Sequence, residues 1–315
     1  DRLLDKTVVL DFDRTGFRRH KAGFDPADLD VDLAGRVALV TGANSGLGLA
    51  TSRGLAARGA TVYLACRNPE RGEAARDQVR FDTGNTNVHL EVVDVSSPSS
   101  LRALADRFNP RLDLLVHNAG VLPHERHLTP EGLELTWATN IAGPFLLTQL
   151  MEPRLQASAQ GRIVFVSSGG MYPQRLDLSD IYWDQRSFDG VKAYANTKRA
   201  QVVLTELYAA RVASTRITVN AMHPGWADTP AVKSSLPRFH RLTRKILRTP
   251  EEGADTILWL AAAERLSGET GRFWFDRAPQ ATHKIPGTSE LPGDRARLWR
   301  LLMKQARLGA PEETR

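Results

Sequence analysis

The segment that most constrains this chain is an apolar run that leads straight into a glycine-rich turn. Residues 36–40 read Arg-Val-Ala-Leu-Val, and residues 41–48 read Thr-Gly-Ala-Asn-Ser-Gly-Leu-Gly. A helical pattern over residues 47–58 follows at once. A buried strand, a tight glycine turn and a helix in this order are typical of the phosphate-binding segment of a doubly wound α/β fold.

Each glycine of the turn has a separate expected task. Gly42 permits the tight turn, Gly46 lets backbone N–H groups approach a pyrophosphate, and Gly48 lets the helix pack close to the strand. The residues between them complete the expected cradle: Asn44, Ser45 and Leu47. A dinucleotide bound here implies hydride transfer, whereas the alternative is a tight turn that holds no ligand.

Apolar, β-rich runs alternate with helical patterns along most of the chain, which predicts βαβ units and a parallel sheet. We expect strands at residues 37–41, 61–66, 88–93, 112–117, 162–167, 217–221 and 271–275. The clearest helices are expected at residues 194–212 and 250–263. The predicted fold is therefore α/β, a single-domain Rossmann-type doubly wound parallel sheet of about seven strands with helices on both faces.

This domain is expected to span residues 32–277, between an N-terminal extension (1–31) and a C-terminal extension (278–315). The second extension starts with a Pro-, Gly-, Ser- and Thr-rich loop and then carries a short apolar helical pattern at Leu298, Trp299, Leu301, Leu302 and Met303.

Composition excludes several classes of protein. The single cysteine, Cys66, rules out an internal disulfide and a cysteine-based metal cluster, and no metal site is predicted. Cys66 ends an apolar strand and is expected to be a buried, inert thiol. No run of 18 apolar residues occurs, so no membrane-spanning segment is expected and a cytoplasmic location is predicted.

Polar residues gather at the ends of the later predicted strands and on one helix. Residues 117–120 read His-Asn-Ala-Gly and end the fourth strand, and Ser168 follows the fifth. Tyr194 and Lys198 lie four residues apart, on one face of a helix. A carbonyl that accepts a hydride needs a proton, which Tyr194 can donate if the Lys198 cation lowers the pKa of its phenol.

The other polar groups fit the same reaction. Ser168 can hold the substrate oxygen, Lys198 can also bond the cofactor ribose, and Asn140 can hold a water that links Lys198 to solvent. Taken singly, the Tyr–Lys pair could be a solvated helix surface, Asn140 a helix cap and Ser168 a turn residue. Their order along the chain, each at a strand end or on the expected helix, favours catalysis.

This order of motifs resembles the short-chain dehydrogenase/reductase superfamily over roughly residues 34–277. The resemblance implies that Ser168, Tyr194 and Lys198 form a catalytic triad with Asn140 as its fourth member. It also implies a cofactor site that includes Tyr194, Lys198 and the glycine turn, with Asp94 against the adenine. Further residues expected to line the cofactor site are Asn118, Ala119, Gly120, Pro224, Gly225 and Thr229.

Residues 167–171, 188–190, 194–206 and 222–230 are similar to the retinol-dehydrogenase-like branch, and particularly to the dehydrogenase/reductase member 12-like proteins. Two departures stand out. His117 occupies a position where the superfamily usually has Asn, and Ser168 and Tyr194 are 26 positions apart, about twice the usual gap. The inserted segment is either a substrate wall or plain loop packing, and its aromatic residues are Tyr172, Tyr182, Trp183 and Phe188.

The second predicted strand indicates which nicotinamide cofactor fits. Preference for NAD needs a carboxylate after this strand, and none is present. Arg67 stands there instead and could pair with a 2′-phosphate, although it could also be a solvated loop charge. The sequence therefore favours NADP (NADPH) over NAD.

A basic segment lies within the expected substrate flap (residues 226–250). Residues 232–248 carry six Lys or Arg and no acidic residue, with Leu236, Phe239, Leu242 and Ile246 at helical spacing. Three interpretations stay open: an amphipathic lid, a peripheral contact with an anionic membrane, or attraction of an acidic substrate or its carrier. No basic–aromatic module for nucleic acid is present.

The sequence thus predicts an NADP(H)-dependent oxidoreductase that interconverts a carbonyl and an alcohol on an apolar, lipid-, retinoid- or steroid-like small molecule. The alternative is a non-catalytic NADP-binding regulatory or scaffold protein. The resemblance also suggests a homo-oligomer, unless the terminal extensions cap the usual helix interface.

Overall fold

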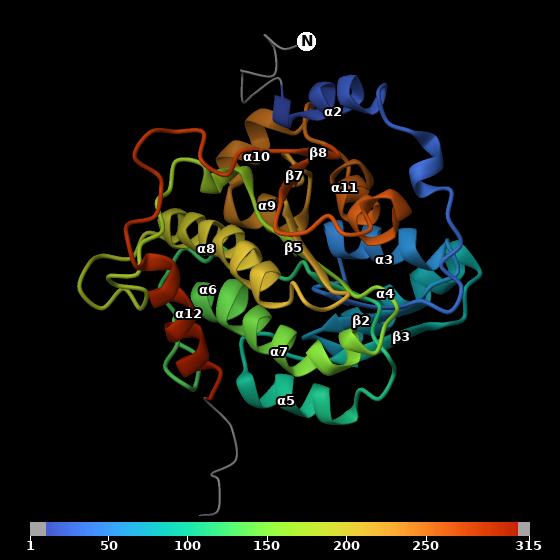
Figure 1. The fold of residues 1–315 in the computed structure, drawn as a ribbon. Helices are drawn as coiled ribbons and strands as arrows, with labels where there is room; N and C mark the ends of the chain where they lie inside the picture. The colour runs from blue at the N-terminus through green and yellow to red at the C-terminus, as the bar shows by residue number, and fades with distance from the viewer. Residues whose placement is uncertain (1–10, 308–315) are drawn as a thin grey trace, which may run out of the picture.

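The computed structural model of the protein describes residues 11–307 (Figure 1). Its centre is a sheet with the strand order β3-β2-β1-β4-β5-β6-β7-β8. Strands β1 to β7 pair in parallel and the short β8 is antiparallel. The strands are β1 (Val37–Thr41), β2 (Thr61–Cys66), β3 (Val88–Val92), β4 (Leu114–His117), β5 (Arg162–Val166), β6 (Thr218–Met222), β7 (Phe273–Phe275) and β8 (Ala278–Pro279).

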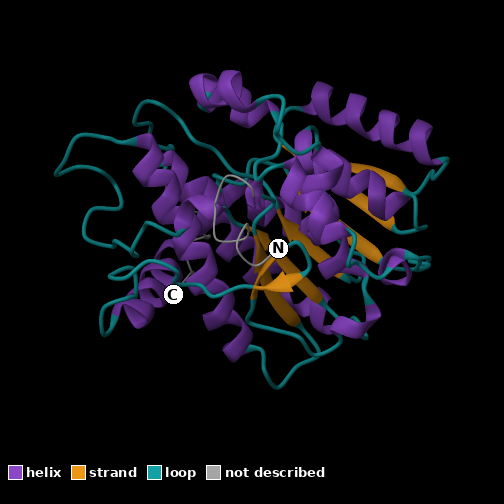
Figure 2. Cartoon of the chain, turned by 90° about the horizontal axis from the view of Figure 1, so that it is seen from above, coloured by secondary structure: helices purple, strands orange, loops and turns teal. Residues whose placement is uncertain are grey.

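Helices cover both faces of this sheet (Figure 2). Alternate residues of one strand point to opposite faces, so Leu39 of β1 joins one apolar cluster while Ala38 and Val40 join the other. The first cluster packs against α5 (Pro98–Arg107), α7 (Gly143–Gln156) and α8 (Gly190–Arg211). The second packs against α3 (Gly46–Ala56), α4 (Pro69–Thr83) and α11 (Pro250–Ala262).

This architecture confirms the predicted fold class and the positions of all seven predicted strands, with ends that shift by up to two residues. Parallel strands buried on both faces are continuous apolar runs, which is why the sequence located them. The strand order reverses between β1 and β4, and in such sheets ligands bind at the carboxyl edge of this switch point.

Both flanking segments contribute to the core. Phe12 precedes α2 (Arg14–Lys21) and is buried in the first cluster, and a 3-10 helix, η2 (Pro26–Leu29), follows. At the other end, α12 (Asp294–Gln305) lies beside α8 in Figure 1 and buries Leu298 and Leu302, which confirms the predicted short helix. The parts of the predicted extensions at residues 1–10 and 308–315 lie outside the described residues.

The basic segment is not one amphipathic helix. It forms two short helices, α9 (Pro230–Ser235) and α10 (Pro237–Thr243), separated at Leu236. Its apolar residues also separate, because Phe239 packs edge-on against Trp226 whereas Leu242 is 83% exposed. Along residues 11–307, no helix combines the length and apolar character that a membrane crossing requires.

Candidate active site

The glycine turn has the geometry expected of a phosphate cradle. Gly42 and Gly46 adopt φ values of +64° and +54°, which side chains rarely tolerate. A Cβ on Gly48 would lie 2.4 Å from the Gly42 carbonyl oxygen, so only glycine lets α3 begin this close to β1. Ser45 precedes α3 but caps none of its N–H groups with its hydroxyl, and it is half-exposed like Asn44 and Leu47. The turn therefore presents a helix N-terminus that an anion can approach.

The residues after β4 hold this turn in place. The Asn118 side-chain amide donates to the carbonyl oxygens of Thr41 (2.9 Å) and Gly42 (3.2 Å). The N–H groups of Asn118 and Ala119 donate to the Thr41 hydroxyl at 3.0 and 3.1 Å. Asn118 thus fixes the shape of the cradle through its amide.

His117 is a structural residue in this arrangement. It is 1% exposed, stacks on Phe165, and places Nε2 2.8 Å from the Thr148 hydroxyl. Because that hydroxyl donates to the Pro144 carbonyl, His117 must donate to it from Nε2. Burial lowers the pKa of His117 to about 3, so the ring is neutral at physiological pH.

The two candidate adenosine contacts lie at the ends of β2 and β3. Arg67 follows β2, is exposed, and has no ion-pair partner within the described part of the chain. Asp94 is half-buried, and its Oδ1 accepts from the N–H and the hydroxyl of Ser96 at 2.9 and 2.7 Å.

Ser168 and Tyr194 meet beyond the end of β5. Ser168 begins a 3-10 turn, η4 (Gly169–Met171), where its hydroxyl accepts from the Gly170 N–H at 3.1 Å. Burial raises the pKa of Tyr194, and a hydrogen bond from Ser168 opposes that rise. This differs from the expectation that Lys198 lowers the phenol pKa, because burial also lowers the pKa of Lys198 itself and so reduces its charge.

Lys198 is 3% exposed and lies one turn beyond Tyr194 on α8, with its Nζ 5.4 Å from the centre of the tyrosine ring. The ammonium donates to the Val166 carbonyl at 2.7 Å and to Gln201 Oε1 at 3.2 Å. Among the described residues no carboxylate pairs with it, and burial lowers its pKa to about 7. Within residues 11–307 the third N–H of the ammonium has no acceptor, which leaves it available to a ligand.

Among the described residues, no hydrogen bond joins Asn140 directly to Lys198. It lies on a π-helix, η3 (Ala138–Ala142), and its Oδ1 accepts from the Val121 N–H at 2.9 Å. Its Nδ2 donates to the Val121 carbonyl (3.1 Å) and to the Thr197 hydroxyl (3.0 Å). Its main-chain carbonyl accepts from Gln201 Nε2 at 2.7 Å, a contact that the sequence analysis missed.

The segment after β6 closes the site against the glycine turn. Gly225 has a φ of +69°, and a Cβ there would lie 2.6 Å from the Phe12 carbonyl oxygen. Pro224 precedes it, and Thr229 caps α9 by accepting from the Val232 N–H. A Cβ on Gly46 would lie 3.2 Å from the Thr229 methyl group, so Thr229 borders the cradle.

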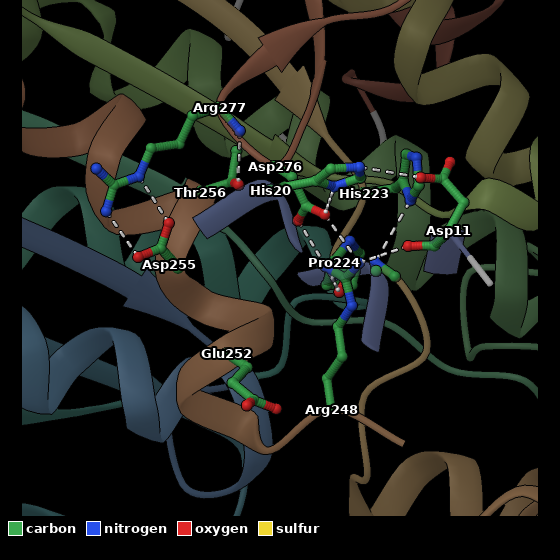
Figure 3. Close-up of polar contacts among 12 residues, drawn as sticks. Asp11, His20, His223, Pro224, Arg248, Glu252, Asp255, Thr256, Asp276 and Arg277 are labelled. Carbon is green, nitrogen blue, oxygen red and sulfur yellow. Dashed lines mark hydrogen bonds and ion pairs between the residues drawn. The ribbon is translucent and has the colours of Figure 1, made fainter. Parts of the chain in front are cut away.

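A buried charge network next to Pro224 was also missed by the sequence analysis (Figure 3). Arg248 is 0% exposed and pairs with both carboxylate oxygens of Asp276 at 2.6 and 2.9 Å. It also donates to the main-chain carbonyls of Asp11 and Asp13. Asp276 accepts a second contact from His20 at 2.7 Å. The network ties the N-terminal segment to the base of the flap and to the β7–β8 turn.

The aromatic residues of the inserted segment pack against the protein itself. Tyr172 lies edge-on to Phe273, and Trp183 packs on Phe188. The Tyr182 hydroxyl accepts from Gln305 at 3.0 Å. The described contacts thus support loop packing rather than a substrate wall.

The chain is similar to known proteins over most of its length. Residues 42–272 match the protein family described as enoyl-(acyl carrier protein) reductase. Dehydrogenase/reductase SDR family member 12 of Bos taurus is 40% identical over 303 residues, which cover 95% of each protein. Human retinol dehydrogenase 12 is 38% identical over 252 residues, covering 78% of this chain and 79% of the relative.

Solved structures of other proteins are similar to this chain as well. An uncharacterized protein from Mycobacterium paratuberculosis matches with a TM-score of 0.71 and 31% identity, over 92% of this chain and 99% of the other. A short chain dehydrogenase from Escherichia coli, complexed with NADPH, matches with a TM-score of 0.65 and 27% identity over 81% of this chain and 100% of the other. This chain therefore belongs to the short-chain dehydrogenase/reductase family of oxidoreductases.

Proposed function

We propose that this protein is an NADP(H)-dependent oxidoreductase that interconverts a carbonyl and an alcohol on an apolar small molecule. The observation that carries the proposal is the arrangement of Lys198. Its ammonium is buried one helical turn from Tyr194, and within the described part of the chain it is held only by neutral oxygens and keeps one N–H for a ligand. Its pKa of about 7 allows proton exchange at physiological pH.

A nicotinamide cofactor, when bound, supplies or accepts the hydride. The residues of the chain handle the proton. In the reductive direction Tyr194 donates its hydroxyl proton to the oxygen that becomes negative, and in the oxidative direction it takes the proton back. Ser168 holds the same oxygen, and Lys198 in its charged form stabilises the phenolate that remains on Tyr194.

The cofactor is proposed to be NADP(H). Three features fit a dinucleotide. They are the glycine turn with its open helix N-terminus, the N–H of Lys198 that has no acceptor among the described residues, and the Asp94 carboxylate. Ser96 donates both of its hydrogen bonds to Oδ1 of Asp94, and we assign Oδ2 to the cofactor. The preference for NADP over NAD rests on Arg67, which is exposed directly after β2, where neither residue 67 nor residue 68 is acidic. NADPH in the Escherichia coli relative supports the same cofactor here.

We assign the cofactor and substrate sites to residues 32–277, with the flap at residues 226–250 over the substrate. The flanks at residues 1–31 and 278–315 are proposed to support this domain. A homo-oligomer remains part of the proposal, but α12 covers α8 through Trp299, which contacts Tyr208. Contact between copies would therefore use a face of the protein other than the part of α8 that α12 covers.

The flap is also proposed to make a peripheral contact with an anionic membrane, from which an apolar substrate would enter. Leu242 is 83% exposed, and Arg238, Arg241 and Arg244 lie exposed on the same short segment. We expect cosedimentation with phosphatidylserine vesicles, reversed by salt and weakened by Leu242→Ser. Arg300→Ser, an exposed change on α12, is the control. Binding that survives high salt, or that Leu242→Ser leaves unchanged, would contradict this contact.

The test of the main proposal is Tyr194→Phe. General acid–base catalysis contributes about 100- to 10,000-fold, so NADPH-dependent reduction of retinal, steroid ketones or long aldehydes should fall by at least about 100-fold. NADPH binding, measured by fluorescence titration, should be unchanged. Full activity in the variant would overturn the proposed role of Tyr194. If the parent protein binds NADPH but reduces none of these carbonyls, the result would favour the regulatory alternative.

A further inference from the structure

A second side chain on α8 makes contacts that the proposed reaction does not yet use. Gln201 lies one turn beyond Lys198 and is 0% exposed. Its Oε1 accepts from the Lys198 ammonium at 3.2 Å, and its Nε2 donates to the Asn140 main-chain carbonyl at 2.7 Å. One amide therefore joins the two groups that were expected to be joined by a water.

The orientation of this amide is forced by its partners. An ammonium can only donate and a carbonyl can only accept, so the reversed amide would set N–H groups against N–H groups and oxygen against oxygen. Both contacts are buried, so each lost partner would leave an unsatisfied polar group.

The local sequence explains why the Asn140 carbonyl is free to accept. In a regular α-helix it would bond the N–H four residues later, but that residue is Pro144, which has none. The helix widens here into η3, where the Gly143 N–H reaches back to the Ala138 carbonyl. The Asn140 carbonyl is left without its helical partner and accepts instead from the Gln201 side-chain amide.

We propose that Gln201 is a positioning residue that links the Lys198 ammonium to the Asn140 carbonyl and takes the bridging role expected of a relay water. This inference rests on the proposed function. Two consequences follow from the chemistry of an amide. Its oxygen stabilises the charged form of Lys198, whereas an amide passes protons on far less readily than water does.

The Gln201 amide thus bridges Lys198 and the Asn140 carbonyl, and among the described residues only the third N–H of Lys198 is left without an acceptor. We expect protons to be exchanged through that N–H. Gln201 therefore sets both the charge state of Lys198 and the direction from which its proton is replaced.

The test measures the pKa of Lys198 directly, in the ligand-free protein, from the ¹³Cε shifts of labelled lysine. The chain has eight lysines, so the resonance can be assigned with Lys198→Met. Gln201→Met removes the oxygen and should lower the pKa of Lys198 by at least about half a unit. Gln201→Glu adds a carboxylate beside the ammonium and should raise that pKa. Gln149→Met, the same change on α7, should leave it unaltered.

Opposite shifts in the two Gln201 variants support the proposal, because general loosening of the site would move both in one direction. No shift in either variant, or a shift of the same sign in both, overturns it. If Gln201→Met does not fold, Gln201→Leu, which also lacks the amide oxygen, is measured in its place.

Turnover gives a second readout. In Gln201→Met, kcat should fall about 10-fold with little change in the KM of the carbonyl, and the pH profile of kcat should move with the NMR pKa. Because the NMR titration needs no substrate, it stands even if Tyr194→Phe shows that the proposed function is wrong.

Discussion

Two buried cations lie near the carboxyl edge of the sheet, and their surroundings are opposite. Lys198 is held by the Val166 carbonyl and by the Gln201 amide, both neutral, and its pKa falls to about 7. Arg248 is held by the Asp276 carboxylate through two hydrogen bonds. A buried amine without a counter-charge can gain and lose its proton, whereas a guanidinium paired with a carboxylate stays charged. We infer that the first arrangement serves chemistry and the second serves structure.

The largest expected effect is on stability at the second cation. Arg248→Met leaves Asp276 buried without its main partner, and breaking such a pair costs roughly 3–5 kcal/mol of unfolding free energy. Denaturant unfolding measures this loss. Arg238→Met, an exposed change on α10, should cost less than about 0.5 kcal/mol. Combining Arg248→Met with Asp276→Asn should recover part of the loss, and a variant as stable as the parent would contradict the structural role.

The next effect concerns the pH dependence of stability at Lys198. The pKa of Lys198 is about 7 in the folded protein, below the reference value of 10.5. Below pH 7 the folded protein therefore carries the full free-energy cost of burying a charged Lys198. Between these two values the unfolded chain binds more protons than the folded chain, so stability rises with pH.

Lys198→Met removes this rise. We expect the stability of the parent relative to the variant to increase by about 2 kcal/mol from pH 7 to pH 9 in the ligand-free protein. Urea unfolding at the two pH values measures it, with Lys304→Met on α12 as an exposed control. A pH-independent difference would mean that Lys198 keeps its charge when buried.

The smallest effect tests an exposed cation, Arg67, that has no ion-pair partner along residues 11–307. Arg67→Ser should weaken NADPH binding by about 10-fold, which corresponds to about 1.4 kcal/mol, and leave NADH binding unchanged. Fluorescence titration of both nucleotides measures the ratio, with Arg300→Ser as the control. Equal weakening for both nucleotides would show that Arg67 does not read the 2′-phosphate.

The contrast between the two cations also separates what the sequence could predict from what it could not. The glycine turn, Ser168, Tyr194 and Lys198 lie at strand ends or one helical turn apart, so local patterns reveal them. Gln201 belongs to the same helix, but its partner, the Asn140 carbonyl, is a main-chain group. The available signal was Pro144, which deprives that carbonyl of its helical partner.

The charge network had no local signal at all. Arg248 and Asp276 are distant in sequence, and the main-chain carbonyls of Asp11 and Asp13 join them only when the N-terminal segment folds back. The helical spacing of the apolar residues over 236–246 did not reveal that this segment forms two helices, although the sequence contains the reason. Pro237 disfavours a helical conformation at Leu236, which is where α9 and α10 separate.

The most direct test of the account is a paired measurement on the purified protein and its Tyr194→Phe variant. NADPH binding is followed by fluorescence, and carbonyl reduction by nicotinamide absorbance, over retinal, steroid ketones, aldehydes and quinones. The account predicts NADPH binding by both proteins and turnover of an apolar carbonyl by the parent alone. Failure of the parent to bind either NADPH or NADH would contradict it.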